Sequence, residues 1–239
     1  MDKLQLNEKD TLTNQEKEVY RTLRTNIEFT GIENKVIAIT SCMPDDGKTT
    51  ISYNLACAFA RNDKKTLFVD ADLRKSIFVQ RYGIEGNPKG LTHYLAGHVP
   101  FTEIVYKTNI DSLYVIPVGT FPSNPTELFA KDRFSKMLEE LKKVFDYIIV
   151  DTPPLGSVID AAVIAQKCDA SMLVVSSNTT SRTFAKSVIT QLKTANPNFL
   201  GIILNKVDVK RSGYYGKRYG SYYKNKYYSY YGYEDEDEE

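Results

Sequence analysis

Short, continuous apolar runs that alternate with helix-like segments constrain the fold of this chain more than any other feature of its sequence. The runs stand at Val36–Ile39, Thr66–Val69, Leu113–Val118, Tyr147–Val150, Met172–Val175 and Leu200–Leu204. Runs of this length suit strands and are too short for helices. A strand that is apolar throughout is covered on both faces, as in parallel sheets flanked by helices. The sequence therefore predicts an α/β fold with a doubly wound, mostly parallel sheet.

Helical patterns occupy the intervals between these runs. We expect helices over residues 13–30, 48–60, 126–144, 157–167 and 182–194. The first has a clear start, because Thr13 and Glu16 have the spacing of a capping box. Its predicted packed face carries residues that recur every four positions, Val19, Leu23 and Ile27. Its predicted exposed face carries charged residues, Glu18, Arg21 and Arg24.

Length and composition narrow the class of protein. A chain of 239 residues suits one domain, or one domain with an appendage. Its 31 Lys and Arg balance 30 Asp and Glu, so the basic excess of a nucleic-acid-binding domain is missing. No apolar run approaches the roughly 18–20 residues that span a bilayer, and residues 1–4 do not begin a signal peptide. Cys42, Cys57 and Cys168 form no disulfide framework or paired metal motif, so we predict a cytoplasmic, reduced protein.

The C-terminal segment differs in composition from the rest of the chain. It holds ten of the chain's 17 tyrosines: Tyr214, Tyr215, Tyr219, Tyr222, Tyr223, Tyr227, Tyr228, Tyr230, Tyr231 and Tyr233. Interleaved Gly, Ser and Lys leave no period that could bury these rings, and the chain then ends in the acidic run Glu234–Glu239. We therefore expect a flexible tail. The predicted organisation is an N-terminal segment over 1–34, a globular domain over 35–209 and the tail over 210–239.

A phosphate-binding loop is predicted after the run at 36–39. Residues 41–50 contain Gly47-Lys48-Thr49 directly before a helix, which is the working half of a Walker A loop. In such loops backbone N–H groups bind phosphate, the lysine reaches the terminal phosphates, and the hydroxyl binds Mg²⁺. The expected nucleotide-binding residues are Pro44, Asp45, Asp46, Gly47, Lys48, Thr49 and Thr50. A lone Gly-Lys-Thr could instead simply start a helix.

Carboxylates at two further strand ends strengthen the nucleotide-binding interpretation. Asp70 and Asp72 follow one run, and Asp151 follows another. A single aspartate there is usually a turn or a helix cap, but three beside a phosphate loop suit Mg²⁺, which favours carboxylate oxygens. The predicted metal ligands are Thr49, Asp72 and Asp151.

Two further polar residues are less specific. Arg74 would pair with one of these aspartates or with phosphate, or lie exposed on the surface. Asn205 follows the last strand, where its amide could hydrogen-bond a nucleotide base. The alternative for Asn205 is a loop that only caps the sheet.

Together these motifs resemble those of the bacterial tyrosine kinases (BY-kinases) of capsule and exopolysaccharide synthesis, in particular the soluble Gram-positive type. The matching segments are the Walker A loop at 41–50, the Walker A′ element at 70–74, the Walker B element at 151–153, the segments 119–128 and 18–24, and the terminal tyrosines. The resemblance covers essentially the whole chain. It departs at Cys42, at Asp45, where relatives commonly have Gly, and at Ser76, where Pro is frequent.

The resemblance implies a P-loop NTPase domain that uses ATP and Mg²⁺ to phosphorylate tyrosine. The catalytic residues would be Lys48, Asp70, Asp72 and Asp151. Asp70 is the candidate base, although Asp70 and Asp72 could exchange roles. A tyrosine hydroxyl titrates near pH 10, so an acceptor tyrosine benefits from a nearby carboxylate.

The resemblance also implies partners. The terminal tyrosines would be autophosphorylated in trans within a homo-oligomeric ring, with an octamer as the candidate size. Glu18, Arg21 and Arg24 would contact the neighbouring subunit. A separate transmembrane activator, the polysaccharide co-polymerase, would recruit the chain to the inner face of the plasma membrane. A protein tyrosine phosphatase would be a further partner, and no nucleic acid is expected as a partner. The kinase would regulate polysaccharide synthesis and export.

Other functions stay open at this point. A MinD/ParA-like ATPase switch shares the expected fold, although such proteins carry an additional lysine where this chain has Cys42-Met43-Pro44. A nucleotide-dependent scaffold without tyrosine kinase activity is a third candidate. The tail could also bind single-stranded nucleic acid by stacking, self-associate, or be inert.

Overall fold

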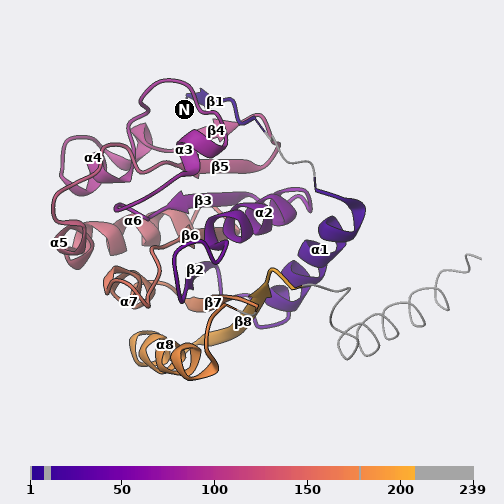
Figure 1. Cartoon of the computed structure of the whole chain (residues 1–239). Coiled ribbons are helices and arrows are strands. Elements are labelled where there is room, and N and C mark those ends of the chain that lie inside the picture. Colours follow the sequence, from indigo (N-terminus) through magenta and orange to yellow (C-terminus); the bar gives the residue numbers. More distant parts are fainter. Residues whose placement is uncertain (1, 8–11, 178, 208–239) are drawn as a thin grey trace, which may run out of the picture. The chain divides into compact units, whose positions relative to one another are not determined.

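The structure is a computed structural model that describes residues 2–7, 12–177 and 179–207 (Figure 1). Its elements follow the chain in the order β1 (Lys3–Leu4), α1 (Asn14–Glu28), β2 (Val36–Ser41), α2 (Lys48–Ala60), β3 (Thr66–Asp70), α3 (Phe78–Arg81), α4 (Leu91–Leu95), a 3₁₀ turn η1 (Phe101–Glu103), β4 (Tyr106–Thr108), β5 (Leu113–Ile116), α5 (Pro125–Ala130), α6 (Asp132–Lys142), β6 (Tyr147–Asp151), α7 (Asp160–Ala165), β7 (Ala170–Ser176), α8 (Arg182–Ala195) and β8 (Phe199–Asn205).

The strands form one sheet in the order β1-β4-β5-β3-β6-β2-β7-β8. Neighbouring strands are parallel except β4 and β5, which are antiparallel. The prediction of an α/β fold with a mostly parallel, doubly wound sheet is therefore confirmed. Each predicted run became a strand, whereas β1 and β4 were not predicted because two or three residues carry too little pattern to indicate a strand.

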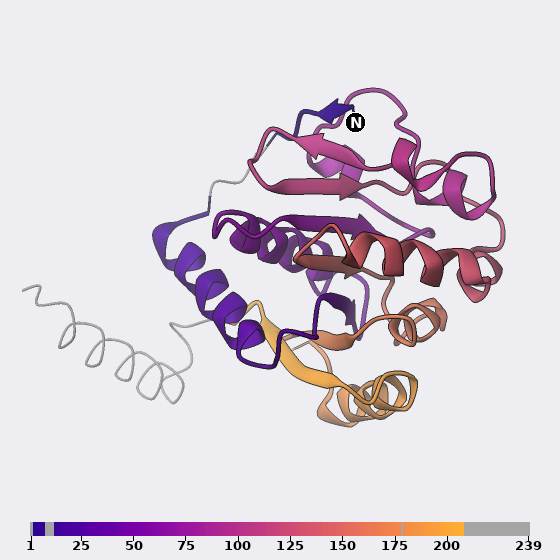
Figure 2. The same cartoon turned by 180° about the vertical axis from the view of Figure 1, so that it is seen from behind.

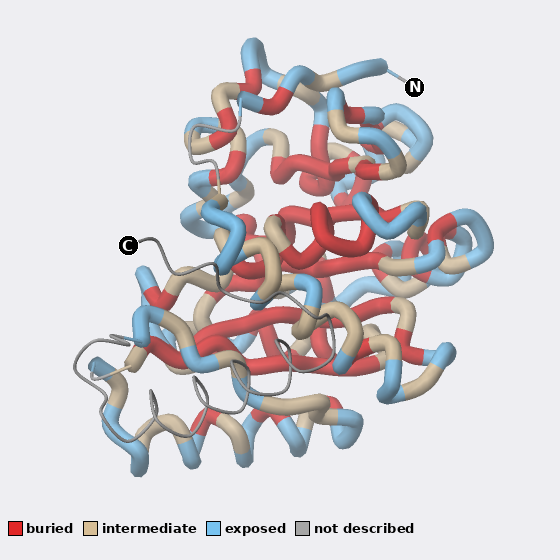
Figure 3. Tube along the Cα trace, turned by 90° about the vertical axis from the view of Figure 1, so that its right-hand side faces the viewer, coloured by how far each residue is buried: buried red, intermediate tan, exposed pale blue. Residues whose placement is uncertain are grey.

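Alternate residues of the central strands pack against helices on opposite faces of the sheet. Ile37 and Ile39 of β2 belong to the core that includes α1 and α2, whereas Val36 packs in the core that includes α6. Successive side chains of a strand point to opposite faces, so a strand between two helical layers is apolar at every position. Figure 1 shows α2 in front of the sheet, and Figure 2 shows α6 on the opposite face. Buried residues follow the strands in Figure 3.

Helix α1 begins as predicted, with one correction to its packed face. Thr13 is the N-cap, and both halves of the capping box with Glu16 are formed. Tyr20, Leu23 and Ile27 pack toward the core, but Val19 is 62% exposed. A strict four-residue recurrence drifts by about 40° per step around a helix of 3.6 residues per turn. Val19 therefore turns away from the face that Ile27 occupies.

Two other helices differ from the sequence-based expectation. The helix expected over 126–144 is divided into α5 and α6 at Lys131, whose backbone is extended (φ −72°, ψ 155°). The break lets Phe129 and Phe134 meet edge to face in the same core, with ring centroids 5.2 Å apart. The helix expected over 157–167 is confined to α7, because residues 152–159 form the loop that leaves β6.

Residues through Asn205 form one unit, and the chain from Lys206 onward forms another. The three-part division with boundaries at residues 34 and 209 stays a prediction. The predicted tyrosine tail lies outside the described residues. Within the described residues, no helix is both long enough and apolar enough to cross a bilayer.

Candidate functional site

The site lies where β3, β6 and β2 end side by side. These strands are neighbours in the sheet, and Asp70 at the end of β3 is paired in register with Asp151 at the end of β6. The loop after β2 leads directly into α2. Because parallel strands place their carboxyl ends at one edge, the phosphate loop and the predicted carboxylates meet there.

The phosphate loop is shaped by residues with left-handed backbone conformations. Asp45 has φ 63° and Gly47 has φ 92°, and Gly47 is the N-cap of α2. Aspartate tolerates this region better than most residues, so Asp45 can adopt this backbone conformation. The φ of Gly47 favours glycine, and a Cβ there would also lie 2.3 Å from Asn205 Nδ2, which would have to move.

Two hydrogen bonds at Asp46 hold the phosphate loop in place. The buried carboxylate of Asp46 accepts a hydrogen bond from the Met43 amide at 2.8 Å. The Asn205 side-chain amide donates to the Asp46 carbonyl, also at 2.8 Å. Asn205 therefore contacts the phosphate loop itself, and its predicted contact with a base stays a prediction.

Thr49 and Asp151 form a buried hydrogen-bonded pair in the site. The Thr49 hydroxyl donates to Asp151 Oδ2 at 2.6 Å, and the Ser52 hydroxyl donates to Asp151 Oδ1 at 3.1 Å. Burial raises the pKa of Asp151, whereas Lys48 and the two hydroxyls oppose that shift. Ser52 was missed at the sequence level, although it lies one turn after Lys48 on α2 and therefore on the same helix face.

Lys48 is held between two of the predicted aspartates. Its Nζ lies 2.9 Å from Asp72 Oδ2 and 3.8 Å from Asp151 Oδ2. Burial disfavours the charged ammonium, but the neighbouring Asp151 and Asp72 carboxylates outweigh it and raise the pKa of Lys48. Lys48 is therefore a cation at neutral pH, as binding of a polyphosphate requires.

Asp70 has a different environment from Asp72. It is fully buried, and burial together with the adjacent Asp151 raises its pKa to about 8. Its Oδ2 accepts a hydrogen bond from the Ser76 hydroxyl, and its Oδ1 accepts one from the Asp72 amide at 3.4 Å. Asp72 instead accepts hydrogen bonds from the amides of Arg74 and Lys75 and pairs with Lys48.

Arg74 pairs with a residue that sequence reasoning missed. Its guanidinium contacts both carboxylate oxygens of the buried Asp160, and Thr126 donates its hydroxyl to the same carboxylate. Arg74 is exposed, as one of the two expectations had it, but it pairs with Asp160 and not with Asp70 or Asp72. The reason is geometric, since the loops after β3, β5 and β6 converge on this point. Its predicted contact with phosphate stays a prediction.

The donor set fits a nucleotide with Mg²⁺. A threonine hydroxyl, two carboxylates, a lysine and the amides that begin α2 offer the oxygen donors that Mg²⁺ prefers and the N–H groups that phosphates prefer. No group of three or more His, Cys, Asp or Glu side chains in the described part of the chain is arranged to hold a metal by itself. Mg²⁺ commonly takes one or two carboxylates and completes its shell with water and phosphate.

The predicted subunit-contact residues lie on α1, outside this cluster. Glu18 and Arg21 form an exposed ion pair of 3.1 Å. Arg24 is more buried than predicted, because its guanidinium reaches the Ala58 carbonyl of α2 at 3.5 Å. The ten predicted phosphorylation sites lie outside the described residues.

The chain matches a known protein family and a tyrosine-protein kinase of similar sequence. A family profile described as "AAA domain" matches residues 34–200. The tyrosine-protein kinase CpsD of Streptococcus agalactiae is 44% identical over 206 residues, which cover 84% of this chain and 90% of that protein.

Two solved structures share the fold. The kinase domain of the Escherichia coli tyrosine kinase ETK superposes with a TM-score of 0.76 and 36% identity, covering 80% of this chain and 75% of that one. The septum site-determining protein MinD of Pyrococcus horikoshii, complexed with Mg-ADP, superposes with a TM-score of 0.64 and 26% identity, covering 73% and 71%.

Proposed function

The chain belongs to the bacterial tyrosine kinases, and we propose on this premise that it is an ATP-dependent protein-tyrosine kinase. The observation that carries the proposal is the cluster of Lys48, Thr49, Asp72 and Asp151 at the phosphate loop, with the buried Asp70 beside it. A MinD-like ATPase switch shares the fold, but the 44% identical relative is a tyrosine-protein kinase, which favours the kinase.

Binding of the nucleotide follows from the loop. The backbone N–H groups of residues 45–50, at the N-terminus of α2, would bind the phosphates, and Lys48 would reach the terminal ones. Thr49 and Asp151 would hold Mg²⁺, with Asp72 beside them. When bound, Mg²⁺ neutralises part of the phosphate charge. Asn205 steadies the loop, and its contact with the base is part of this proposal.

The transfer needs a group that takes the tyrosine proton. The hydroxyl oxygen attacks the γ-phosphorus in line, the bond from that phosphorus to the bridging oxygen breaks, and ADP leaves. Asp70 is the better proton acceptor, because Asp72 is engaged by Lys48 and by two backbone amides. The raised pKa of Asp70, about 8, brings it closer to that of a tyrosine hydroxyl near 10.

The proposed acceptors are the ten tyrosines of the tail, presented in trans to a neighbouring subunit of a homo-oligomer. Each phosphotyrosine adds about −1.5 to −2 charges, so several would make the tail strongly negative. Accumulated charge would repel neighbouring tails and dissociate the ring. We further propose two partners, a transmembrane activator that recruits the chain to the membrane and a tyrosine phosphatase. The kinase would control capsular or exopolysaccharide synthesis and export.

The kinase activity is tested by the intact mass of the purified protein before and after Mg²⁺-ATP. We expect serial additions of one phosphate that peptide mapping confines to the ten tail tyrosines. In Lys48→Met the rate of phosphate addition should fall by about 100-fold or more, because the charge on the transferred phosphoryl group is no longer balanced. Lys136→Met changes an exposed lysine of α6 and serves as the matched control. ADP release without phosphotyrosine would instead support the ATPase switch.

Oligomer formation is tested separately by sedimentation. Arg21→Ala/Arg24→Ala should dissociate the assembly, while Arg182→Ala, at an exposed position of α8, should leave it intact. Unchanged assembly of the double variant would reject the role of α1 in subunit contact.

A further inference from the structure

Both carboxylate oxygens of Asp151 are held by hydroxyls of α2. The Thr49 hydroxyl donates to Asp151 Oδ2 at 2.6 Å, and the Ser52 hydroxyl lies 3.1 Å from Asp151 Oδ1. Lys48 Nζ is on the Oδ2 side as well, at 3.8 Å. The phosphate-loop motif supplies Thr49 and Lys48, whereas Ser52 comes from the following turn of the helix and holds the second oxygen.

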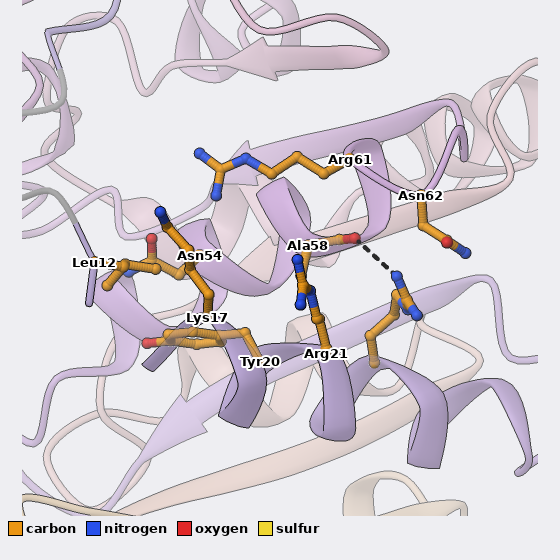
Figure 4. Close-up of a pocket in the computed structure, with 9 residues that line it drawn as sticks. Leu12, Lys17, Tyr20, Arg21, Asn54, Ala58, Arg61 and Asn62 are labelled. Atoms are coloured by element: carbon orange, nitrogen blue, oxygen red, sulfur yellow. Dashed lines mark hydrogen bonds between the residues drawn. The ribbon is translucent and has the colours of Figure 1, made fainter. Parts of the chain in front are cut away.

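Helical periodicity directs the Ser52 side chain toward β6. Thr49 and Ser52 are three residues apart, so their side chains lie on the same face of α2. Asn54 is two residues further along, which is about 200° around a helix of 3.6 residues per turn. Its side chain lines the cavity between α2 and α1 (Figure 4). Ser52 is therefore on the face of α2 that covers the sheet, where β6 ends at Asp151.

The contact between Ser52 and Asp151 is shielded from solvent. Both residues are 0% exposed. A carboxylate oxygen in such a place loses the water that would solvate it, so a hydrogen bond from a hydroxyl replaces part of that solvation. The carboxylate cannot turn without giving up one of its two hydroxyl donors. The protein itself therefore fixes the orientation of the Asp151 carboxylate.

The Ser52 hydroxyl has a second possible acceptor, which explains its position less well. Ser52 Oγ lies 2.8 Å from the Lys48 carbonyl, one turn earlier on α2. In an α-helix that carbonyl accepts the backbone N–H four residues later, which here is the N–H of Ser52 itself. A hydroxyl has one hydrogen to donate, and a charged acceptor forms the stronger hydrogen bond. Donation to Asp151 is therefore favoured, and the Lys48 carbonyl keeps its helical partner.

We propose that Ser52 is a positioning residue that orients Asp151 and thereby raises the affinity of the phosphate loop for Mg²⁺. The inference rests on the proposed function, in which Thr49 and Asp151 hold Mg²⁺ beside the nucleotide. With Oδ1 engaged by Ser52, Oδ2 stays toward Thr49 and Lys48, at the start of α2. Removing a side chain that hydrogen-bonds a metal-binding carboxylate typically lowers metal affinity by about 10- to 100-fold.

The test measures binding of ADP to the full chain by calorimetric titration, in EDTA and over a series of Mg²⁺ concentrations. Ser52→Ala should bind ADP in EDTA within about two-fold of the wild type, but should need about ten-fold more Mg²⁺ for the same gain in ADP affinity. Ser171→Ala is the matched control. It removes the same hydroxyl at a 0% exposed position of β7, where that hydroxyl makes no hydrogen bond, and should behave as the wild type.

Ser52→Cys is the second variant, and it decides the question if Ser52→Ala does not fold. Its thiol is a weak donor of similar size, so its Mg²⁺ requirement should lie above that of the wild type and below that of Ser52→Ala. An unchanged Mg²⁺ requirement in these variants, or a loss of ADP affinity that is equal with and without Mg²⁺, would overturn the proposal. Wild-type ADP binding that does not respond to Mg²⁺ would refute the metal site of the proposed function, and this inference with it, so the two failures are distinguishable.

Discussion

Arg74 and Asp160 form an ion pair between the loop that leaves β3 and the first turn of α7. Arg74 Nη2 lies 3.1 Å from Asp160 Oδ1, and Arg74 Nε contacts the second carboxylate oxygen. The Asp160 side chain is 1% exposed and that of Arg74 is 39% exposed. Thr126 at the start of α5 also contacts Asp160, so one buried carboxylate ties together three loops that border the phosphate site.

Removing that carboxylate should destabilise the fold. Asp160→Ala leaves the partly exposed Arg74 and the Thr126 hydroxyl without their acceptor, and we expect a loss of about 1–3 kcal/mol in the free energy of unfolding. Urea denaturation of the purified variant measures this loss. Asp111→Ala, at an exposed position, is the control and should change stability by less than about 0.5 kcal/mol. An Asp160→Ala protein as stable as the control would show that the pair is energetically neutral.

Ser76→Ala should shift the pH dependence of phosphoryl transfer. The Ser76 hydroxyl donates to Asp70 and lowers the pKa of that carboxyl, against the larger effect of burial. Without the hydroxyl, a smaller fraction of Asp70 is ionised at pH 7. We expect kcat to fall about three- to ten-fold at pH 7, equivalent to one half to one pKa unit, and the deficit to narrow toward pH 9.

The conservative variant separates this effect from a structural one. Ser76→Thr keeps the hydroxyl and should retain the wild-type profile. A Ser76→Ala deficit that is constant from pH 7 to pH 9 would contradict a role through the Asp70 proton.

The contribution of Asp70 to the stability of the metal-free protein should fall as the pH rises from about 4 to about 8. In the folded state, burial beside Asp151 raises the pKa of Asp70 to about 8, whereas an unfolded aspartate titrates near 3.9. Between these values the folded state keeps a proton that the unfolded state has released. The free energy of unfolding therefore decreases with increasing pH through this range.

Thermal unfolding in the presence of EDTA measures this dependence. Asp70→Asn removes the buried titrating group and should flatten the decline, whereas Asp111→Asn should not. An identical pH dependence in Asp70→Asn and the wild type would exclude Asp70 as its source.

The capping box of α1 should contribute a measurable part of the stability. The Thr13 hydroxyl accepts a hydrogen bond from the Glu16 amide at 3.2 Å, and the Thr13 amide donates one to the Glu16 carboxylate at 2.8 Å. Thr13→Ala should lower the free energy of unfolding by about 1 kcal/mol. Thr183→Ala, at an exposed position of α8, is the control. Equal urea midpoints for the two variants would argue against the cap.

The capping box makes the free energy of unfolding depend on pH in the opposite direction from Asp70. The hydrogen bonds from Thr13 lower the pKa of Glu16. Its stabilisation is therefore present above the pKa of an unfolded glutamate and is lost as the pH falls through the lower folded value. The stability difference between Thr13→Ala and the wild type should shrink in acid.

Most of the fold was predictable because its signals are local. The apolar run at 36–39 and the Gly47-Lys48-Thr49 sequence after it identify a strand, a phosphate loop and a helix start from adjacent residues. Val19 was misplaced because a four-residue recurrence only approximates the helical period. The break at Lys131 was missed because it depends on how Phe129 and Phe134 share one core.

The sequence by itself determined the α/β class, the phosphate loop and the presence of carboxylates at strand ends, since these depend on the periodicity and chemistry of neighbouring residues. Only the tertiary structure decided that β6 lies between β3 and β2, which sets Asp151 against both Asp70 and Thr49. It alone joined Arg74 to Asp160. These partners are far apart in the chain, and contacts between distant residues are selected by strand order and helix packing, which leave no local pattern in the sequence.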